Sequence, residues 1–155
     1  MNFESKIKKH KGFAMLYAVL VSSILLSIGL AIFNLTVKEL LLSSLGRDSQ
    51  FAFYAADTGA ECALYWDFQG DAFASSTPAA NINCANEDRV VTSINLGGGA
   101  YRRTFEMDFS PEPYCTIVSV TKYDSPRRTI VEARGYNTCN IANPRRVERA
   151  IRATY

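Results

Sequence analysis

The sequence predicts an α+β fold in which a long N-terminal helix packs on a small antiparallel sheet of about five strands. The 25 residues from Phe13 to Val37 carry no charged side chain, and the apolar pattern continues beyond them with helical spacing. After residue 88, apolar and polar residues alternate in short runs between turn residues, as is typical of antiparallel strands. A helix and a sheet of this size can pack together, so that each buries one apolar face of the other.

The segment 13–37 is long enough to span a membrane. A helix of its 25 residues would be about 37 Å long, whereas the hydrocarbon core of a bilayer is about 30 Å thick. Four lysines against Glu4 leave a charge of +3 in the first twelve residues, while Lys38 and Glu39 cancel behind the segment. The positive-inside bias therefore predicts a single-pass protein with its N-terminus in the cytoplasm and its C-terminal domain outside.

Helical spacing continues from residue 38 to residue 66, where we expect an amphipathic, extramembrane half of the same helix. Apolar or small residues recur every three, four or seven positions, and polar residues recur on the opposite face. No proline interrupts the run, so one helix should extend from Phe13 to about Trp66. The small residues of the apolar face would let a sheet approach closely; they are Ala52, Ala56, Gly59 and Ala63.

The remaining chain predicts a connecting loop and then a sheet domain. Segment 67–88 is rich in Ala, Ser, Asn and Asp and contains Pro78, so we expect a loop there. Segment 89–155 alternates as strands do, and its triple glycine lacks the Lys-Ser/Thr of a phosphate loop, which favours a turn. The expected strands are 89–96, 100–109, 114–122, 129–136 and about 146–155.

Four cysteines, all beyond the apolar segment, predict two disulfide bonds. None of them forms the Cys-x-x-Cys pair that is typical of zinc or redox sites. Intracellular thiols are the alternative, but the predicted topology places these residues outside the reducing cytoplasm. Three pairings are open, and we favour the sequence-local one, which joins Cys62 to Cys84 and Cys115 to Cys139.

The junction in front of the apolar segment resembles a processing signal. In KKHKGF, basic residues are followed by Gly12 and then by Phe13, which opens the apolar run. This order is similar to the type III signal that prepilin peptidase cuts in type IV pilins and type II secretion pseudopilins. The resemblance implies a leader at 1–12, cleavage after Gly12 and N-methylation of Phe13.

Two further features are similar to minor pilins. Most major pilins carry glutamate at the fifth mature position, where this chain has Tyr17. The run RDSQFAFYAADTGAECALYW resembles the segment behind the membrane span of PilX-type minor pilins, with Asp57 in place of the family's glutamate and Phe51 as an extra residue. The matching positions are Arg47, Asp48, Gln50, Ala52, Phe53, Ala55, Ala56, Asp57, Ala60, Tyr65 and Trp66.

The resemblance implies a minor type IV pilin that assembles into a pilus through its N-terminal helix and serves adhesion, motility or DNA uptake. Its implied partners are other pilin subunits, prepilin peptidase, the pilus assembly machinery and the membrane. It would lie in the cytoplasmic membrane before assembly and in an extracellular or periplasmic filament afterwards. The alternatives are a type II secretion tip pseudopilin and a signal-anchored extracellular binding module that never assembles.

The sequence predicts no enzyme, cofactor or metal site. The only histidine, His10, lies in the implied leader, so the mature chain would have none for acid–base or metal chemistry. Acidic residues in and near the predicted loop could gather around calcium, but their spacing repeats no known calcium loop, which favours solvated side chains. These residues are Asp67, Asp71, Glu87 and Asp88.

The last third of the chain is locally basic. Its arginines could hold DNA phosphates or an acidic neighbouring subunit, and solvated sheet faces explain them equally well. No basic groove with interleaved aromatic residues is visible in the sequence, so DNA is the less favoured partner. The arginines are Arg102, Arg103, Arg127, Arg128, Arg134, Arg145, Arg146, Arg149 and Arg152.

Overall fold

The computed structural model describes residues 11–74, 76 and 78–155, and the side chains from Phe13 onward. The chain forms two compact units, Met1–Ser44 and Leu45–Tyr155. Helix α1, Lys11–Gly70, supplies all of the described part of the first unit and the helix of the second. It is continuous because its sequence contains no proline. The expected α+β class, with one long N-terminal helix and a small antiparallel sheet, is confirmed.

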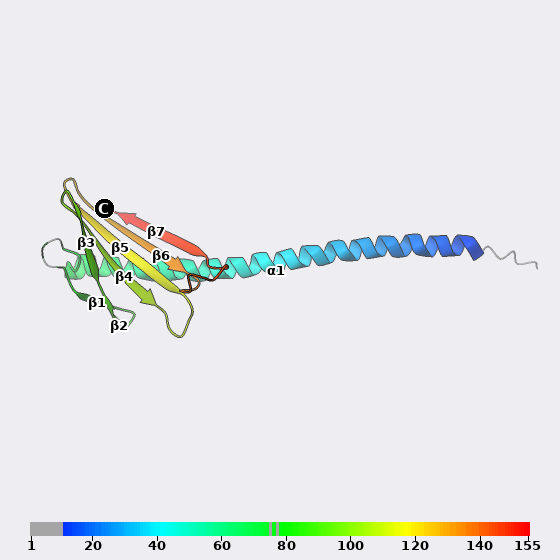
Figure 1. Cartoon of the computed structure of the whole chain (residues 1–155), viewed down its shortest axis with the longest axis horizontal. Helices are drawn as coiled ribbons and strands as arrows, with labels where there is room; N and C mark the ends of the chain where they lie inside the picture. Colours follow the sequence, from blue (N-terminus) through cyan, green and yellow to red (C-terminus); the bar gives the residue numbers. More distant parts are fainter. Residues whose placement is uncertain (1–10, 75, 77) are drawn as a thin grey trace, which may run out of the picture. The chain divides into compact units, whose positions relative to one another are not determined.

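The second unit contains two antiparallel sheets. The larger sheet has five strands in the order β3-β4-β5-β6-β7, so every neighbour in space is also a neighbour in sequence (Figure 1). The smaller sheet is the hairpin β1-β2. The strands are β1 Asn81–Cys84, β2 Glu87–Val90, β3 Thr92–Gly97, β4 Ala100–Asp108, β5 Cys115–Asp124, β6 Arg127–Tyr136 and β7 Glu148–Thr154.

The predicted hairpin turns are present in the larger sheet. The triple glycine joins β3 to β4 with φ angles of +80°, +62° and +76°, a backbone conformation that side chains other than glycine rarely adopt. Strands β5 and β6 pair without interruption from Cys115 opposite Tyr136 to Asp124 opposite Arg127. The centre of the sheet is therefore regular, and successive side chains of β5 and β6 point to opposite faces.

Two sequence predictions need correction between the helix and the larger sheet. Helix α1 ends at Gly70, and the expected loop 67–88 holds β1 and the start of β2. The expected strand 89–96 is divided, because residues 89–90 belong to β2 and residues 92–96 belong to β3 in the other sheet.

Tertiary contacts explain the extra hairpin. The Ile82 side chain is only 2% exposed, and Trp66 Nε1 donates a hydrogen bond of 2.8 Å to the Asn83 carbonyl. The two residues that turn the chain, Ala85 and Asn86, have φ angles of +54° and +63°, as a tight hairpin turn requires. The helix thus anchors a strand whose sequence has few of the residues that favour strands.

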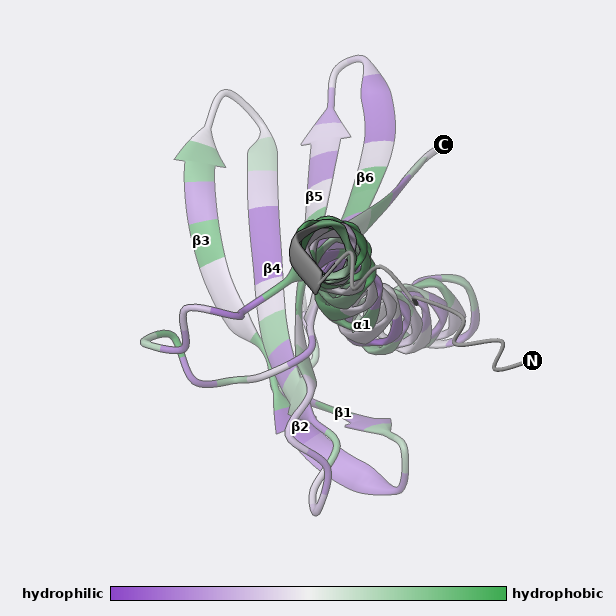
Figure 2. Ribbon diagram, turned by 90° about the vertical axis from the view of Figure 1, so that its right-hand side faces the viewer, coloured by the Kyte–Doolittle hydropathy of each residue, from purple (hydrophilic) through white to green (hydrophobic). Residues whose placement is uncertain are grey.

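The core lies between α1 and one face of the larger sheet. Along β4, β5 and β6, alternate side chains point to the helix, and Figure 2 shows hydrophilic and hydrophobic bands following one another along β3 and β4. The small residues of α1 allow a close approach, as the sequence predicted. The largest fully buried side chains are Phe73, Phe105, Ile82, Met107, Val118, Val120 and Val131.

The closest approach involves two glycines. A Cβ atom on Gly135 of β6 would lie 2.0 Å from the Ala52 carbonyl oxygen and 2.4 Å from the Ala56 nitrogen. A Cβ atom on Gly59 of the helix would lie 2.7 Å from Val118 Cγ2. The obstacle at Gly135 is backbone, which cannot rotate away as a side chain can, so this position requires glycine more strictly than Gly59 does.

We expect Gly135→Ala to lower the free energy of unfolding by about 3 kcal/mol, since β6 must move away from the helix. The measurement is thermal unfolding of the full-length chain in detergent, followed by near-ultraviolet circular dichroism, with a fall in Tm of about 10 °C or more. The control is Gly46→Ala on the exposed helix surface, where no atom lies within 4 Å and alanine should leave stability unchanged or higher. Equal Tm values for the two variants would contradict the close contact.

Candidate functional site

The N-terminal part of α1 has an apolar surface that no other described residue covers. An 18-residue window within it is apolar enough to cross a membrane, and none of that window is buried. Apolar side chains project on all sides of the helix instead of forming one stripe, as is typical of a membrane span. The segment is therefore a candidate single membrane span.

The serine and threonine hydroxyls of this segment are also compatible with lipid. Every serine and threonine between Phe13 and Val37 donates its hydroxyl to a main-chain carbonyl three or four residues earlier in the helix. These hydroxyls need no external partner, and the helix satisfies its own main-chain groups. The four residues are Ser22, Ser23, Ser27 and Thr36.

The Gly12–Phe13 junction lies in the first turn of α1, which begins at Lys11. The Phe13 side chain is 75% exposed, and the Tyr17 side chain one turn later is exposed as well. Most of the expected leader, including His10, lies outside the described residues. Cleavage after Gly12 and methylation of Phe13 stay predictions.

The cysteines pair as expected. The Cys62–Cys84 bond joins α1 to β1, with 6.0 Å between the two Cα atoms. The Cys115–Cys139 bond joins the start of β5 to the connection between β6 and β7, with 5.6 Å between the Cα atoms. The first bond ties the β1-β2 hairpin to the helix, and the second ties the β6–β7 connection to the central sheet. Each closed loop stabilises the fold by roughly 3 kcal/mol.

The acidic residues considered for calcium contact groups within the chain. Asp71 lies 3.4 Å from Lys122 Nζ, Glu87 is paired with Arg89, and the Asn83 amide donates to Asp88 over 2.9 Å. In the described part of the chain, no three His, Cys, Asp or Glu side chains are grouped so that they could hold a metal ion.

Asp67 has a different role, at the centre of a polar contact between the helix end and the sheet. Its side chain is only 4% exposed, and Lys122 Nζ lies 2.6 Å from Asp67 Oδ1. The hydroxyl of Tyr155 donates to Asp67 Oδ2 over 2.6 Å. The Tyr155 ring stacks on Phe68 at 5.0 Å, and its main chain exchanges two hydrogen bonds with Thr129. The last residue of the chain thus holds α1 against the sheet.

The arginines of the last third are divided between the two faces of the larger sheet. On the helix-facing side, Arg103 is 2% exposed and donates from Nη2 to the Ala74 carbonyl over 2.9 Å. Arg149 Nε donates to Ser49 Oγ over 2.7 Å on the same side. The alternation of β4 predicts that Arg103 shares a face with Phe105, so the signal for its burial was present in the sequence.

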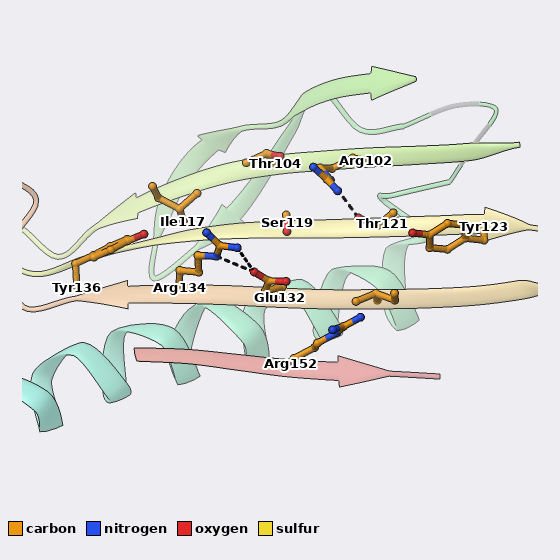
Figure 3. Close-up of a pocket in the computed structure, with 11 residues that line it drawn as sticks. Arg102, Thr104, Ile117, Ser119, Thr121, Tyr123, Glu132, Arg134, Tyr136 and Arg152 are labelled. Carbon is orange, nitrogen blue, oxygen red and sulfur yellow. Dashed lines mark hydrogen bonds and ion pairs between the residues drawn. The ribbon is translucent and has the colours of Figure 1, made fainter. Parts of the chain in front are cut away.

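On the opposite face, side chains from four strands enclose a groove of about 360 Å³, called here the outer groove. Figure 3 shows it extending across β4, β5, β6 and β7, with Tyr123 and Tyr136 toward its two ends. Its charged residues are Arg102, Arg134, Arg152 and Glu132, and its hydroxyl-bearing residues include Ser119 and Thr121.

The groups in the outer groove differ in their partners. Arg134 is bound by Glu132, with 2.7 Å between Arg134 Nε and Glu132 Oε1, and this hydrogen bond together with the carboxylate charge raises the pKa of Arg134. Arg102 makes only a long contact of 3.4 Å to the Thr121 hydroxyl. Burial, followed by a hydrogen bond to Glu148, raises the pKa of Tyr136.

Other arginines lie outside the groove. The guanidinium of Arg128 lies 4.8 Å from the Tyr123 ring centroid, and that of Arg146 lies 3.7 Å from the Tyr136 centroid. Arg127 and Arg145 are exposed. The sequence shows that the last third of the chain is rich in arginine. Only the register of the strands shows that Arg102, Arg134 and Arg152 meet in one groove.

Comparisons of this chain with models of protein families, with curated proteins and with solved structures give no match. The functional assignment therefore rests on the residues and on the geometry described above.

We expect Tyr155→Phe to lower the free energy of unfolding by about 1 kcal/mol at pH 7. The variant removes a hydrogen bond to a charged group, and the partial exposure of the ring moderates the loss. Tyr65→Phe is the control, because Tyr65 is an exposed tyrosine on α1, the helix that carries Asp67. Urea unfolding at neutral pH measures both changes, and equal midpoints for both variants would contradict the role of the contact.

A second expectation concerns alkaline pH. Burial, and then the hydrogen bond and charge of Asp67, raise the pKa of Tyr155 above its ordinary value of 10.0. The unfolded chain therefore releases the phenolic proton first, and stabilisation that is complete below pH 10 is lost as the pH rises further. The pair of Lys122 and Asp67 is present in the wild type and in Tyr155→Phe alike. The difference in stability between the two proteins therefore reports the ionisation of the Tyr155 phenol alone.

The stability advantage of the wild type over Tyr155→Phe should accordingly shrink between pH 10 and pH 11.5. Urea unfolding at stepped pH values measures it. A constant advantage across this range would show that Tyr155 ionises equally easily in the folded and unfolded chains.

Proposed function

We propose that this protein is a minor subunit of a type IV pilus-like filament. The precursor is held in the cytoplasmic membrane by the N-terminal part of α1, and its sheet domain lies outside. Prepilin peptidase removes residues 1–12 and leaves Phe13 as the methylated N-terminus. The subunit then enters the filament through helix–helix packing with other pilin subunits.

The observation that carries this proposal is the apolar surface of α1 directly behind the Gly12–Phe13 junction. A plain signal anchor needs an apolar segment, but it needs no single glycine between the basic residues and the first apolar residue. Cleavage at this point removes the lysines and keeps the whole anchor. An apolar surface on all sides of a helix is stable only in lipid or among other apolar helices. A filament with a core of such helices provides the second environment.

Tyr17 favours a minor subunit over the repeating major one. A glutamate at this position is thought to pair with the N-terminal amine of a neighbouring subunit, and an aromatic side chain cannot form that ion pair. An uncharged residue also avoids the cost of placing a carboxylate within the bilayer. The subunit would therefore enter the filament without this ion pair to set its register.

The test of this proposal is mass spectrometry of the mature N-terminus after expression in the native cell. We expect the first residue to be Phe13 with one added methyl group on its nitrogen. An intact N-terminus beginning at Met1, in protein extracted from the membrane, would contradict processing and reduce the segment to a plain anchor.

Two substitutions test which property of Gly12 matters. Gly12→Ala should still be processed, because the side chain remains small, whereas Gly12→Glu should leave the precursor uncut. The ratio of precursor to mature chain on an immunoblot measures this difference. Equal processing of both variants would mean that small size at position 12 is not what the peptidase requires.

A further inference from the structure

The outer groove brings together groups that the sequence separates. In the register of the sheet, Thr104, Ser119, Glu132 and Arg152 form one row across β4, β5, β6 and β7. Arg102 belongs to the next row, beside Thr121. Neighbouring strands are about 4.8 Å apart, so the main chains that carry Arg102 and Arg152 are separated by about 14 Å. Both long side chains can therefore reach a ligand that lies over β5 and β6.

Two guanidinium groups of the groove lack an acidic partner. Among the residues that the structure describes, neither Arg102 nor Arg152 has a carboxylate within 4.0 Å, whereas Arg134 is paired with Glu132. A guanidinium binds a carboxylate or a phosphate with two parallel hydrogen bonds, and it gives up its water more readily than an ammonium group does. The groove therefore offers two anion-binding groups at its sides.

The floor between them is lined by hydroxyl groups. Ser119 and Thr121 on β5 and Glu132 on β6 lie between the strands that carry the arginines, and Thr104 lines the groove two residues from Arg102 on β4 (Figure 3). These groups can donate to or accept from the hydroxyls of a sugar ring. A phosphate can accept from these hydroxyls, but it has no hydroxyl donor for the Glu132 carboxylate, whereas a sugar ring has.

We propose that the outer groove binds a sugar that carries a carboxylate, within an acidic oligosaccharide. Arg102 or Arg152 holds the carboxylate, while the hydroxyl-lined floor and Glu132 bind the ring hydroxyls. The carboxylate could belong to a uronic acid inside a chain or to an acidic sugar at its end, and the chemistry at the groove is the same.

The same observations disfavour a single-stranded nucleic acid. Glu132 occupies Arg134 within the groove, so only two of the three guanidinium groups there are available to a run of phosphates. Nucleic-acid grooves also provide open aromatic rings for the bases. Here Arg128 lies over the Tyr123 ring, and Tyr136 is only 6% exposed beneath Arg146.

The experiment measures binding to the full-length protein in nonionic detergent by isothermal titration calorimetry. The probes are an oligogalacturonate of about five sugars, the same oligomer with its carboxylates methyl-esterified, sialyllactose, and an oligothymidylate of about fifteen nucleotides. We expect saturable binding of at least one acidic sugar and binding of the ester that is at least about 10-fold weaker, because the ester lacks the charge. Preference for oligogalacturonate or for sialyllactose distinguishes an internal from a terminal acidic sugar.

Variants connect that binding to the groove. Arg102→Gln and Arg152→Gln should each weaken binding of the preferred sugar, one of them by at least about 10-fold, since each loses a charge-assisted contact. Arg145→Gln is the matched control, because it removes the same charge from an exposed loop outside the groove. Its affinity should stay within about twofold, and the Tm values of all three variants should equal that of the wild type.

Four results would each overturn the proposal. They are the absence of saturable binding to both acidic sugars, equal affinity for the acid and its methyl ester, tighter binding of the oligothymidylate, and unchanged affinity in both groove variants. The groove lies within the Leu45–Tyr155 unit, and its binding in detergent requires no processing at Gly12. A failed binding test therefore leaves the filament proposal unaffected, and the reverse also holds.

Discussion

The structure depends on the contact between the backbone of α1 and β6 at Gly135. At this point the strand lies so near Ala52 and Ala56 that there is no room for a Cβ atom. The central register of β5 and β6 then places Val118 and Thr116 against Gly59. Because the interior is packed at the density of a solid, a shift at this contact would be passed to the whole helix-facing side of the sheet.

This contact also determines the composition of the opposite face. Side chains alternate strictly along a strand, so placing one set against the helix directs the other set into the outer groove. Arg102 and Arg103 are adjacent in the sequence, yet one lines the groove and the other is buried beside the helix. A register slip of one residue in β4 would exchange their roles. The groove therefore depends on the packing of the core as much as on its own residues.

The two units of the chain have separate physical tasks under the proposed function. The N-terminal part of α1 provides an apolar surface and no other feature that would distinguish one ligand from another. The second unit provides the sheet, with one disulfide bond between α1 and the β1-β2 hairpin and another between β5 and the connection from β6 to β7. A protein with an anchor of this kind keeps its recognition surface at a membrane or along a filament, while the anchor takes no part in binding.

Among the three cysteine pairings that the sequence left open, the structure contains the sequence-local one that we favoured. The sequence by itself determined the fold class, the candidate membrane span and the hairpin turns of the larger sheet. Each depends on residues close together in the chain, such as the uncharged run from Phe13 to Val37 or the triple glycine. Only the tertiary structure decided the β1-β2 hairpin, the contact of Tyr155 with Asp67 and the outer groove. Local preference argues against a strand at Asn81–Cys84, and burial of Ile82 overrides it. The groove combines residues from four strands, so its composition becomes visible only when the register is known.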